Sequence, residues 1–276
     1  MRTIDLDSWD DLPQALAELR DELGADPGLG PERQYHKRGP TLLFRGHADS
    51  QWGLETTLER WSERQFTVQE YLRRAHSCVN EIESVTGREW HLRTVAQIEE
   101  EIVSQQMPSK VHLPHYDFLV YLRHHGFPSP LLDWTTSPFV AAYFAYEQQT
   151  AAERCGLFAF VRQPTDEGQP VGERLIQTQG PKVTAHVRHF SQKAWYTTST
   201  RWNAEQQSHT FVPHLPSDVG DQGPRELFWR ITLPRRDRLK ALRNLEDYNI
   251  NHFTLYQTDD ALIRTMTLRT FVLAEE

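Results

Sequence analysis

Apolar positions recur at helical spacing in the first half of the chain, and short apolar runs typical of strands dominate the second half. Ser8, with Asp11 three residues later, predicts a helix start, which Pro13 moves a residue or two along the chain. The helix is expected to run to about Leu23. It should bury four apolar side chains, those of Trp9, Leu12, Leu16 and Leu19.

A linker and a buried strand are predicted next. Residues 24–38 are rich in proline, glycine and charge and predict a linker, whereas Thr41 to Arg45 predicts a short buried strand. Helices should follow at residues 54–107 in two or three pieces, at 116–125 with Gly126 as the C-terminal cap, and from Ser137-Pro138 onward.

The pattern then changes period. Strands are expected at residues 156–161 and 226–233, weaker ones at 183–187 and 209–212, helices at 236–245 and 258–266, and a last strand at 268–273. Helices first and strands mostly later favour an α+β fold in a single domain, residues 1–276. Residues 1–38 form its acidic N-terminal helix and linker, and residues 39–276 form the core, with a helical insertion after the Arg45 strand.

Charge divides the chain unevenly. The formal net charge is −8, and residues 1–29 carry eight carboxylates against two arginines. Residues 225–243, by contrast, hold seven basic residues and two acidic ones. This basic run is interpreted either as a solvated strand-helix face or as a nucleic-acid contact surface. Charge alone neither supports nor excludes a nucleic-acid substrate.

Cysteine usage and hydropathy indicate the setting of the protein. Only Cys78 and Cys155 are present among 276 residues, which favours a reduced cytoplasmic location over a disulfide scaffold. No apolar run approaches the roughly 20 residues of a membrane span, and the acidic first residues are unlike a signal peptide. Histidines and cysteines lack metal-ligand spacing, so no metal is expected.

Arg45 and Gly46 end the first apolar run, so a planar cation is expected at the end of a strand. One interpretation is a structural ion pair with a carboxylate. The other is a clamp for a phosphate or carboxylate, in which Gly46 permits close approach of the backbone.

A second segment, residues 124–138, combines groups that an ordinary core does not need. It contains two histidines, the Asp133-Trp134 pair and three hydroxyl side chains, Thr135, Thr136 and Ser137. Ser137 is also an adequate helix N-cap. A helix that begins at Pro138 would offer unpaired N–H groups and a positive dipole end to a pyrophosphate.

Together these segments resemble the FRG domain family, which is named after its Phe-Arg-Gly motif. The chain has Phe44-Arg45-Gly46, then His125-Gly126 leading to Leu131-Leu132-Asp133-Trp134-Thr135 and an aromatic-alanine helix. A looser third motif, Arg-x-x-x-Gln-x-x-x-Phe-like, corresponds to residues 201–211. The resemblance spans roughly Thr41 to Phe211.

The order of the three motifs is remotely similar to that of mono-ADP-ribosyltransferases. This similarity implies a split β-sheet core and NAD as co-substrate, with no metal. It implies that the NAD site contains Arg45, Gly46, His47, Trp134, Thr135, Thr136, Ser137 and Tyr143. The ribose 2′-hydroxyl would meet one of three side chains, Glu205, Gln206 or Gln207, and His125 or Asp133 would be the base that activates the acceptor.

The function that this resemblance implies is transfer of ADP-ribose from NAD to a nucleic acid base, in DNA rather than RNA. It implies a toxin-like or anti-phage role, no membrane partner, and an antitoxin or reversing hydrolase as partner. Two alternatives stay open. One is a non-catalytic module that recognises a nucleotide or a protein, and the other is an NAD glycohydrolase.

Overall fold

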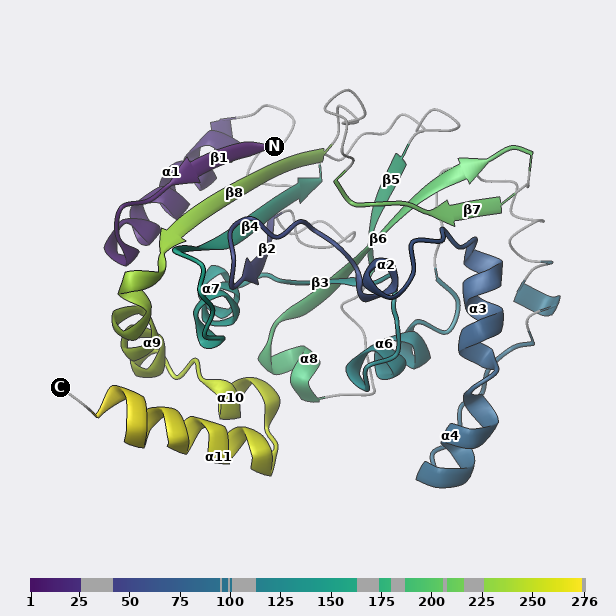
Figure 1. The fold of residues 1–276 in the computed structure, drawn as a ribbon. Helices are drawn as coiled ribbons and strands as arrows, with labels where there is room; N and C mark the ends of the chain where they lie inside the picture. The colour runs from purple at the N-terminus through teal and green to yellow at the C-terminus, as the bar shows by residue number, and fades with distance from the viewer. Residues whose placement is uncertain are drawn as a thin grey trace.

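A computed structural model of the chain describes residues 1–25, 42–94, 96–98, 100, 113–162, 174–179, 187–205, 208–215 and 226–274. In these residues the chain forms an eight-stranded mixed sheet covered by helices (Figure 1). The α+β class is therefore confirmed. The predicted linker lies mostly outside the described residues.

The sheet has the strand order β1-β8-β4-β2-β3-β6-β5, and β7 pairs with β6. Among the strands that the structure describes, only β1 and β8 pair in parallel; the other pairs are antiparallel. The strands are β1 (Arg2–Asp5), β2 (Leu42–His47), β3 (Leu132–Thr135), β4 (Arg154–Arg162), β5 (Arg174–Gln179), β6 (Ala194–Asn203), β7 (Ser208–Phe211) and β8 (Glu226–Pro234).

The sheet is nearly divided where β2 meets β3. A single registered pair, Phe44 with Thr135, joins these two strands. On either side the pairing is extensive, because β2 is registered with β4 along its whole length and β3 likewise with β6. The two half-sheets therefore diverge next to Arg45 and Asp133.

Helices cover the two halves separately (Figure 1). The half with β4 and β8 packs against α1 (Leu12–Ala25), α7 (Pro138–Glu147) and α9 (Arg238–Asp247). The half with β6 packs against α3 (Val68–His76) and α6 (Tyr116–His124). The remaining described helices are α2 (Thr57–Trp61), α4 (Val79–Thr86), α8 (Val187–Ser191), α10 (His252–Tyr256) and α11 (Asp259–Leu268).

Local capping chemistry explains why the early predictions hold. Ser8 and Asp11 form a reciprocal capping box, and α1 buries Leu12, Leu16 and Leu19 as expected. Gly126 takes the left-handed conformation (φ +87°) that ends α6, and Ser137 accepts a hydrogen bond from the backbone of Val140 at the start of α7. The predicted helical insertion is present, since α2, α3, α4 and α6 lie between β2 and β3 in the chain.

Three predictions of secondary structure need correction. The expected strand at residues 268–273 is wrong, because α11 continues into a π-helical turn, Arg269–Leu273, which Arg269 ties to Glu246 on α9. Of the expected strand at 183–187, only Val187 is described, and it begins helix α8. Strands β1, β5 and β6 were not predicted.

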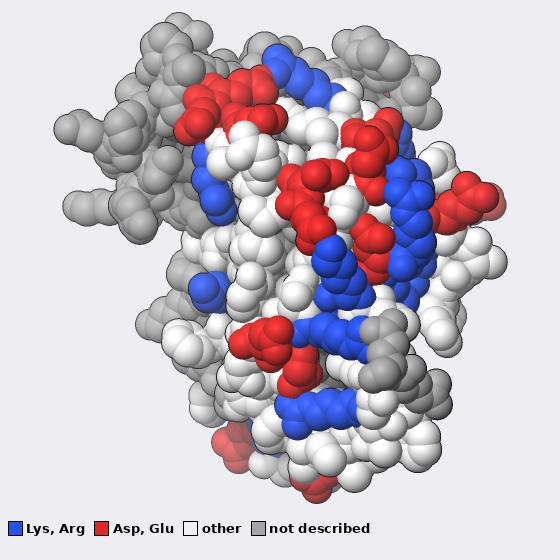
Figure 2. All heavy atoms as spheres, turned by 90° about the vertical axis from the view of Figure 1, so that its left-hand side faces the viewer, with Lys and Arg blue, Asp and Glu red and all other residues white. Residues whose placement is uncertain are grey.

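The basic run of residues 225–243 is mostly engaged within the molecule. Arg235 is buried and donates to the carbonyls of Ala48 and Ala145 at 2.9 and 3.0 Å. Arg238 donates to the last carbonyls of α7, and Lys240 pairs with Asp10. Figure 2 shows acidic and basic side chains interleaved over this face rather than a uniform basic patch. These contacts favour a structural role for the run.

Candidate functional site

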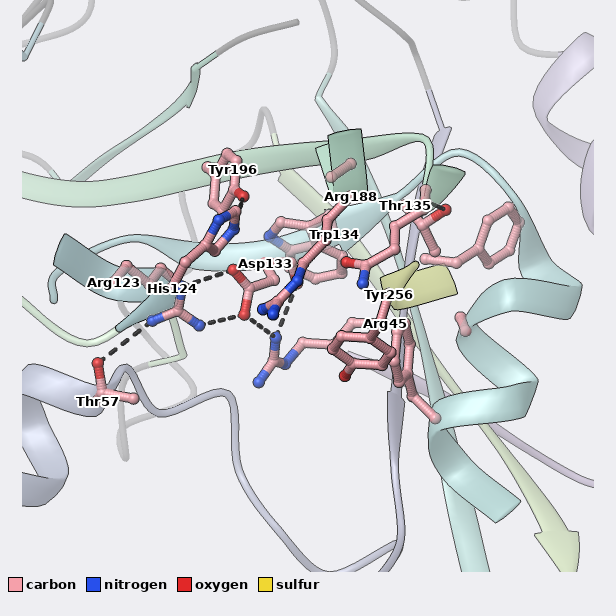
Figure 3. A pocket seen from close by; sticks show the side chains of 16 residues that line it. Arg45, Thr57, Arg123, His124, Asp133, Trp134, Thr135, Arg188, Tyr196 and Tyr256 are labelled. Carbon is pink, nitrogen blue, oxygen red and sulfur yellow. Dashed lines mark hydrogen bonds and ion pairs between the residues drawn. The ribbon is translucent and has the colours of Figure 1, made fainter. Parts of the chain in front are cut away.

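A cavity of about 360 Å³ lies where the two half-sheets diverge (Figure 3). Strands β2, β3 and β6 and helices α2, α6, α7, α8 and α10 all contribute to it. Its lining consists of Phe44, Arg45, Gly46, Thr57, Arg123, His124, Asp133, Trp134, Thr135, Ala141, Phe144, Arg188, Gln192, Ala194, Tyr196 and Tyr256.

Arg45 is held rigidly at this opening. Its Nε donates to His47 Nε2 at 2.8 Å, and its Nη1 donates to the carbonyl of Asp133 at 2.8 Å. Only 15% of its side-chain surface is exposed. Burial lowers the pKa of Arg45 to about 10, so the guanidinium stays charged at neutral pH. Among the described residues Nη2 has no hydrogen-bond partner, which leaves one N–H edge for an anionic ligand.

His47 serves Arg45 as a neutral acceptor. Burial, with the neighbouring charge of Arg45, lowers the pKa of His47 to about 3. Because Nε2 accepts from Arg45, the ring proton must reside on Nδ1, which faces the carbonyl of Trp52 at 3.4 Å. His47 therefore positions the guanidinium and does not itself line the cavity.

Asp133 is shared by two arginines. Arg123 from α6 donates hydrogen bonds to both carboxylate oxygens, and Arg45 Nη1 lies 3.6 Å from Oδ2. Burial alone would raise the pKa of Asp133. The charge and hydrogen bonds of Arg123, with the charge of Arg45, outweigh this effect and lower the pKa to about 2. A carboxylate held this firmly is a weak general base, so the structure favours an anchoring role for Asp133.

The cavity is cationic with aromatic walls. Three arginines and one carboxylate line it, which leaves a formal charge of +2 with histidine neutral. Arg188 lies over the ring of Tyr256, with its Cζ 5.1 Å from the ring centroid. The described aromatic side chains of the lining are Phe44, Trp134, Phe144, Tyr196 and Tyr256. Such a lining suits a ligand that combines negative charge with a flat ring.

The histidine that reaches the cavity is His124. Its Nε2 lies 2.9 Å from the hydroxyl of Tyr196, and both residues line the cavity. The predicted residue, His125, is the exposed C-cap of α6 and packs on Tyr121, with ring centroids 4.4 Å apart. The structure thus does not place His125 in the cavity, because the helix ends one residue earlier with His124 facing inward.

Most hydroxyl and aromatic side chains of the second motif have structural roles, because they bond to or pack against other parts of the chain. Thr135 donates to the carbonyl of Gln192 at 2.7 Å, and Trp134 Nε1 donates to Thr197 at 2.7 Å inside the core. Thr136 and Ser137 do not line the cavity, nor does the buried Tyr143. Helix α7 presents its side rather than its N-terminus to the cavity, through Ala141 and Phe144.

Gly46 has a structural use in addition to the predicted approach to a ligand, which stays a prediction. It lines the cavity, yet a Cβ built on it would lie 1.8 Å from the carbonyl oxygen of Ala141 in α7. The missing side chain therefore lets α7 rest directly on β2. Close approach of the β2 backbone to the α7 backbone is by itself sufficient to require glycine here.

The described residues of the third motif do not line this cavity. Glu205 is exposed in the turn that follows β6, which ends at Asn203, and lines a separate hollow with Arg64, Glu70 and Arg201. Gln206 and Gln207 lie outside the described residues. The carboxylate expected beside the ribose is therefore not supplied by Glu205 in this arrangement of the chain.

Several lining residues carry no signal in the sequence. In the sequence, Arg123 is indistinguishable from an ordinary arginine on a helix. Its partner Asp133 is only ten positions later, but no motif connects the two. Arg188, Tyr196 and Tyr256 follow the second motif by many residues and belong to no motif of their own. Only the fold brings them to Arg45.

Residues 40–154 match the family model of the FRG domain. The chain contains an FRG domain. The match includes Arg45, Arg123 and Asp133, whereas Arg188, Tyr196 and Tyr256 come from beyond it. The FRG segment therefore supplies the arginine-carboxylate cluster, and the rest of the chain completes the walls.

No curated protein and no solved structure matches the chain. Among the described residues, no cluster of histidine, cysteine, aspartate or glutamate has an arrangement that could hold a metal ion. None of the described helices combines the length and apolar character needed to cross a bilayer.

Buried neutral histidines predict that the FRG domain protein loses stability in acid. Burial lowers the pKa of His47 and His214 to about 3, from an ordinary value of 6.5. Between these values the unfolded chain binds protons that the folded chain does not, so stability should fall as pH decreases from about 6.5 towards 3. Each group contributes up to about 1.4 kcal/mol per pH unit.

Urea unfolding across this pH window tests the expectation. His47→Gln, whose amide oxygen can still accept from Arg45, should unfold with a shallower pH dependence than the native chain. The exposed His91, changed to Gln, serves as the control and should leave the dependence unchanged. Equal slopes for the native chain and His47→Gln would contradict the assignment.

Proposed function

We propose that the cavity binds NAD and that the protein transfers ADP-ribose from NAD to a nucleic acid base, in DNA rather than RNA. The observation that carries this proposal is the open Nη2 edge of Arg45 in a cationic, aromatic-walled cavity of about 360 Å³. A pyrophosphate suits the guanidinium edge, and a nicotinamide or adenine ring suits the aromatic walls.

The proposed step breaks the bond between the nicotinamide nitrogen and C1′ of the ribose. Nicotinamide leaves as a neutral molecule with the bonding electrons, a base nitrogen of the acceptor attacks C1′, and that base releases a proton. Positive charge develops on the ribose during this step, and a nearby carboxylate would stabilise it. Asp133 is the one carboxylate among the described lining residues, and Arg123 and Arg45 already neutralise it.

A non-catalytic recognition module is the second candidate. Two observations favour it: Asp133 is fully engaged by arginines, and Glu205 lies in a separate hollow. Such a module would bind the same ligand in the same cavity without cleaving it. The transferase and the recognition module therefore share NAD binding and differ in whether a product forms. The NAD glycohydrolase alternative would also bind NAD, but it would release nicotinamide without labelling an acceptor.

Calorimetric titration with NAD and transfer of label from NAD to single-stranded DNA, RNA or duplex DNA together separate these functions. NAD binding together with transfer of label to the nucleic acid supports the transferase. NAD binding with release of nicotinamide but no labelled nucleic acid supports the glycohydrolase. Binding without turnover supports the recognition module. If the folded protein neither binds NAD nor cleaves it, the proposal is wrong. A toxin-like role predicts that expression slows cell growth.

Replacing Arg45 by alanine should weaken NAD binding roughly 100-fold, because at least one charge-assisted hydrogen-bond pair with the phosphates is lost. Arg45→Lys should give an intermediate loss, since an ammonium cannot serve His47, Asp133 and a phosphate together. Arg20→Ala removes an exposed arginine on α1 and provides the control. Titration of all three variants with NAD measures the effect, and unchanged binding by Arg45→Ala would refute the clamp.

A further inference from the structure

Helix α2 separates the Arg45 cavity from a second cavity of about 440 Å³. Thr57 lines the Arg45 cavity, whereas Leu58, Glu59, Ser62 and Glu63 line the second one. Residues three and four positions apart share one side of a helix. Arg60 and Trp61 therefore flank the side of Thr57, whereas Glu55, Glu59 and Glu63, within α2 and on either side of it, line the second cavity.

Arg60 lies close enough to the Arg45 cluster to act on its charges. Burial is the main cause of the low pKa values of Arg45 and His47, and the charge of Arg60 adds to both shifts. Arg60 is itself exposed and makes one long hydrogen bond, from Nη1 to the carbonyl of Glu55 at 3.4 Å. A further, solvent-facing cation thus lies near Arg45 and His47.

Two tryptophans close to Arg60 or to its neighbour His47 are solvent-exposed: Trp61 follows Arg60 in α2, and the ring of Trp52 lies near that of His47. The exposed fraction is 74% for Trp61 and 46% for Trp52, and the other six tryptophans of the chain are buried or half-buried. The ring centroid of Trp52 lies 6.3 Å from that of His47, the partner of Arg45. Indole rings normally bury most of their apolar surface, so exposed ones beside a cation indicate a surface that binds a ring-bearing anion.

We propose that Trp52, Arg60 and Trp61 bind the acceptor as single-stranded nucleic acid, with bases stacked on the indoles and a backbone phosphate on Arg60. Unpaired bases offer both faces for stacking, whereas a duplex hides them. The positive charge of Arg60, next to Trp61 in α2, favours a polyanion over an apolar peptide. The inference rests on the proposed function for the identity of the acceptor, but the surface itself is independent of NAD.

Fluorescence anisotropy with a short labelled single-stranded oligodeoxynucleotide tests this surface. Trp61→Ala and Trp52→Ala should each weaken binding about tenfold, the size expected for loss of one stacked base, and Arg60→Ala should weaken it and flatten its salt dependence. Trp61→Phe retains an aromatic face and should restore most of the affinity. Phe271→Ala removes a ring whose exposed fraction, 67%, lies between those of the two indoles; its turn, Arg269–Leu273, is near the C-terminus, away from α2 in Figure 1, and the change should have no effect.

Calorimetric titration of the same variants with NAD separates this inference from the proposed function. Trp61→Ala and Trp52→Ala should bind NAD as the native chain does. If oligonucleotide binding depends on Trp61 while NAD fails to bind, the acceptor surface stands and the proposed function falls. If Trp61→Ala and Trp52→Ala bind the oligonucleotide as tightly as Phe271→Ala does, or if duplex displaces the single strand, the inference is overturned. Equal urea midpoints for all variants exclude misfolding as the cause.

Discussion

Gly46→Ala is expected to unfold the protein or to destabilise it by at least about 3 kcal/mol, beyond the usual range for an overpacked site. The new Cβ would lie 1.8 Å from the carbonyl oxygen of Ala141 and 2.8 Å from the backbone nitrogen of Ala145. Both atoms belong to the backbone of α7, so no side-chain rotation relieves the clash. The helix must move away from β2, and with it the cavity wall that Phe144 provides.

The free energy of unfolding in urea measures this effect, and soluble yield provides a second measure. Gly53→Ala is the matched control, because a Cβ at Gly53 meets nothing within 4 Å. Its unfolding free energy should remain within about 0.5 kcal/mol of the native value. A Gly46→Ala protein as stable as Gly53→Ala would show that α7 does not rest on β2 as described.

Asp133→Asn is expected to destabilise the protein by about 3 kcal/mol. The change leaves the guanidiniums of Arg45 and Arg123 side by side without a neutralising charge, although only 15% and 8% of their side-chain surfaces are exposed. This value is the lower end of the range for broken buried ion pairs, because 44% of the Asp133 side-chain surface is exposed and solvent screens part of the interaction.

Urea unfolding at neutral pH measures the loss, with the exposed Asp21→Asn on α1 as control. If uncompensated charge is the cause, the double variant Asp133→Asn with Arg123→Met should be more stable than the sum of the two single losses predicts. Strict additivity would show that the carboxylate and Arg123 act independently, contrary to the contacts between them.

The sequence predicted those parts of the fold that local chemistry determines. Ser8, Gly126 and Ser137 cap their helices through contacts within a few residues, so their roles follow from the neighbouring sequence. Strand β6 was missed because its centre is a run of hydroxyl residues, which resembles a loop. Their burial depends on distant partners, as when the hydroxyl oxygen of Thr197 accepts a hydrogen bond from the indole N–H of Trp134.

The candidate site shows the same limit. Arg45 and Asp133 were both predicted as site residues, but their contact with each other was not, since it depends on β2 meeting β3. Arg123 carries no sequence signal, because an arginine near the end of a helix is usually solvated. Tyr256 reaches the cavity only through helix α10, which the sequence did not predict.

The parallel pairing of β1 with β8 has a consequence for how the chain folds during synthesis. The backbone of Trp9 donates to Asp237, 228 positions later, and Leu6 donates to Thr232. The first strand therefore has no partner until most of the chain has left the ribosome. Until then the edge of β1 stays unpaired and the apolar side chains of α1 lack the part of their core that β8 and α9 supply, so the nascent chain exposes apolar surface and a strand edge to other chains.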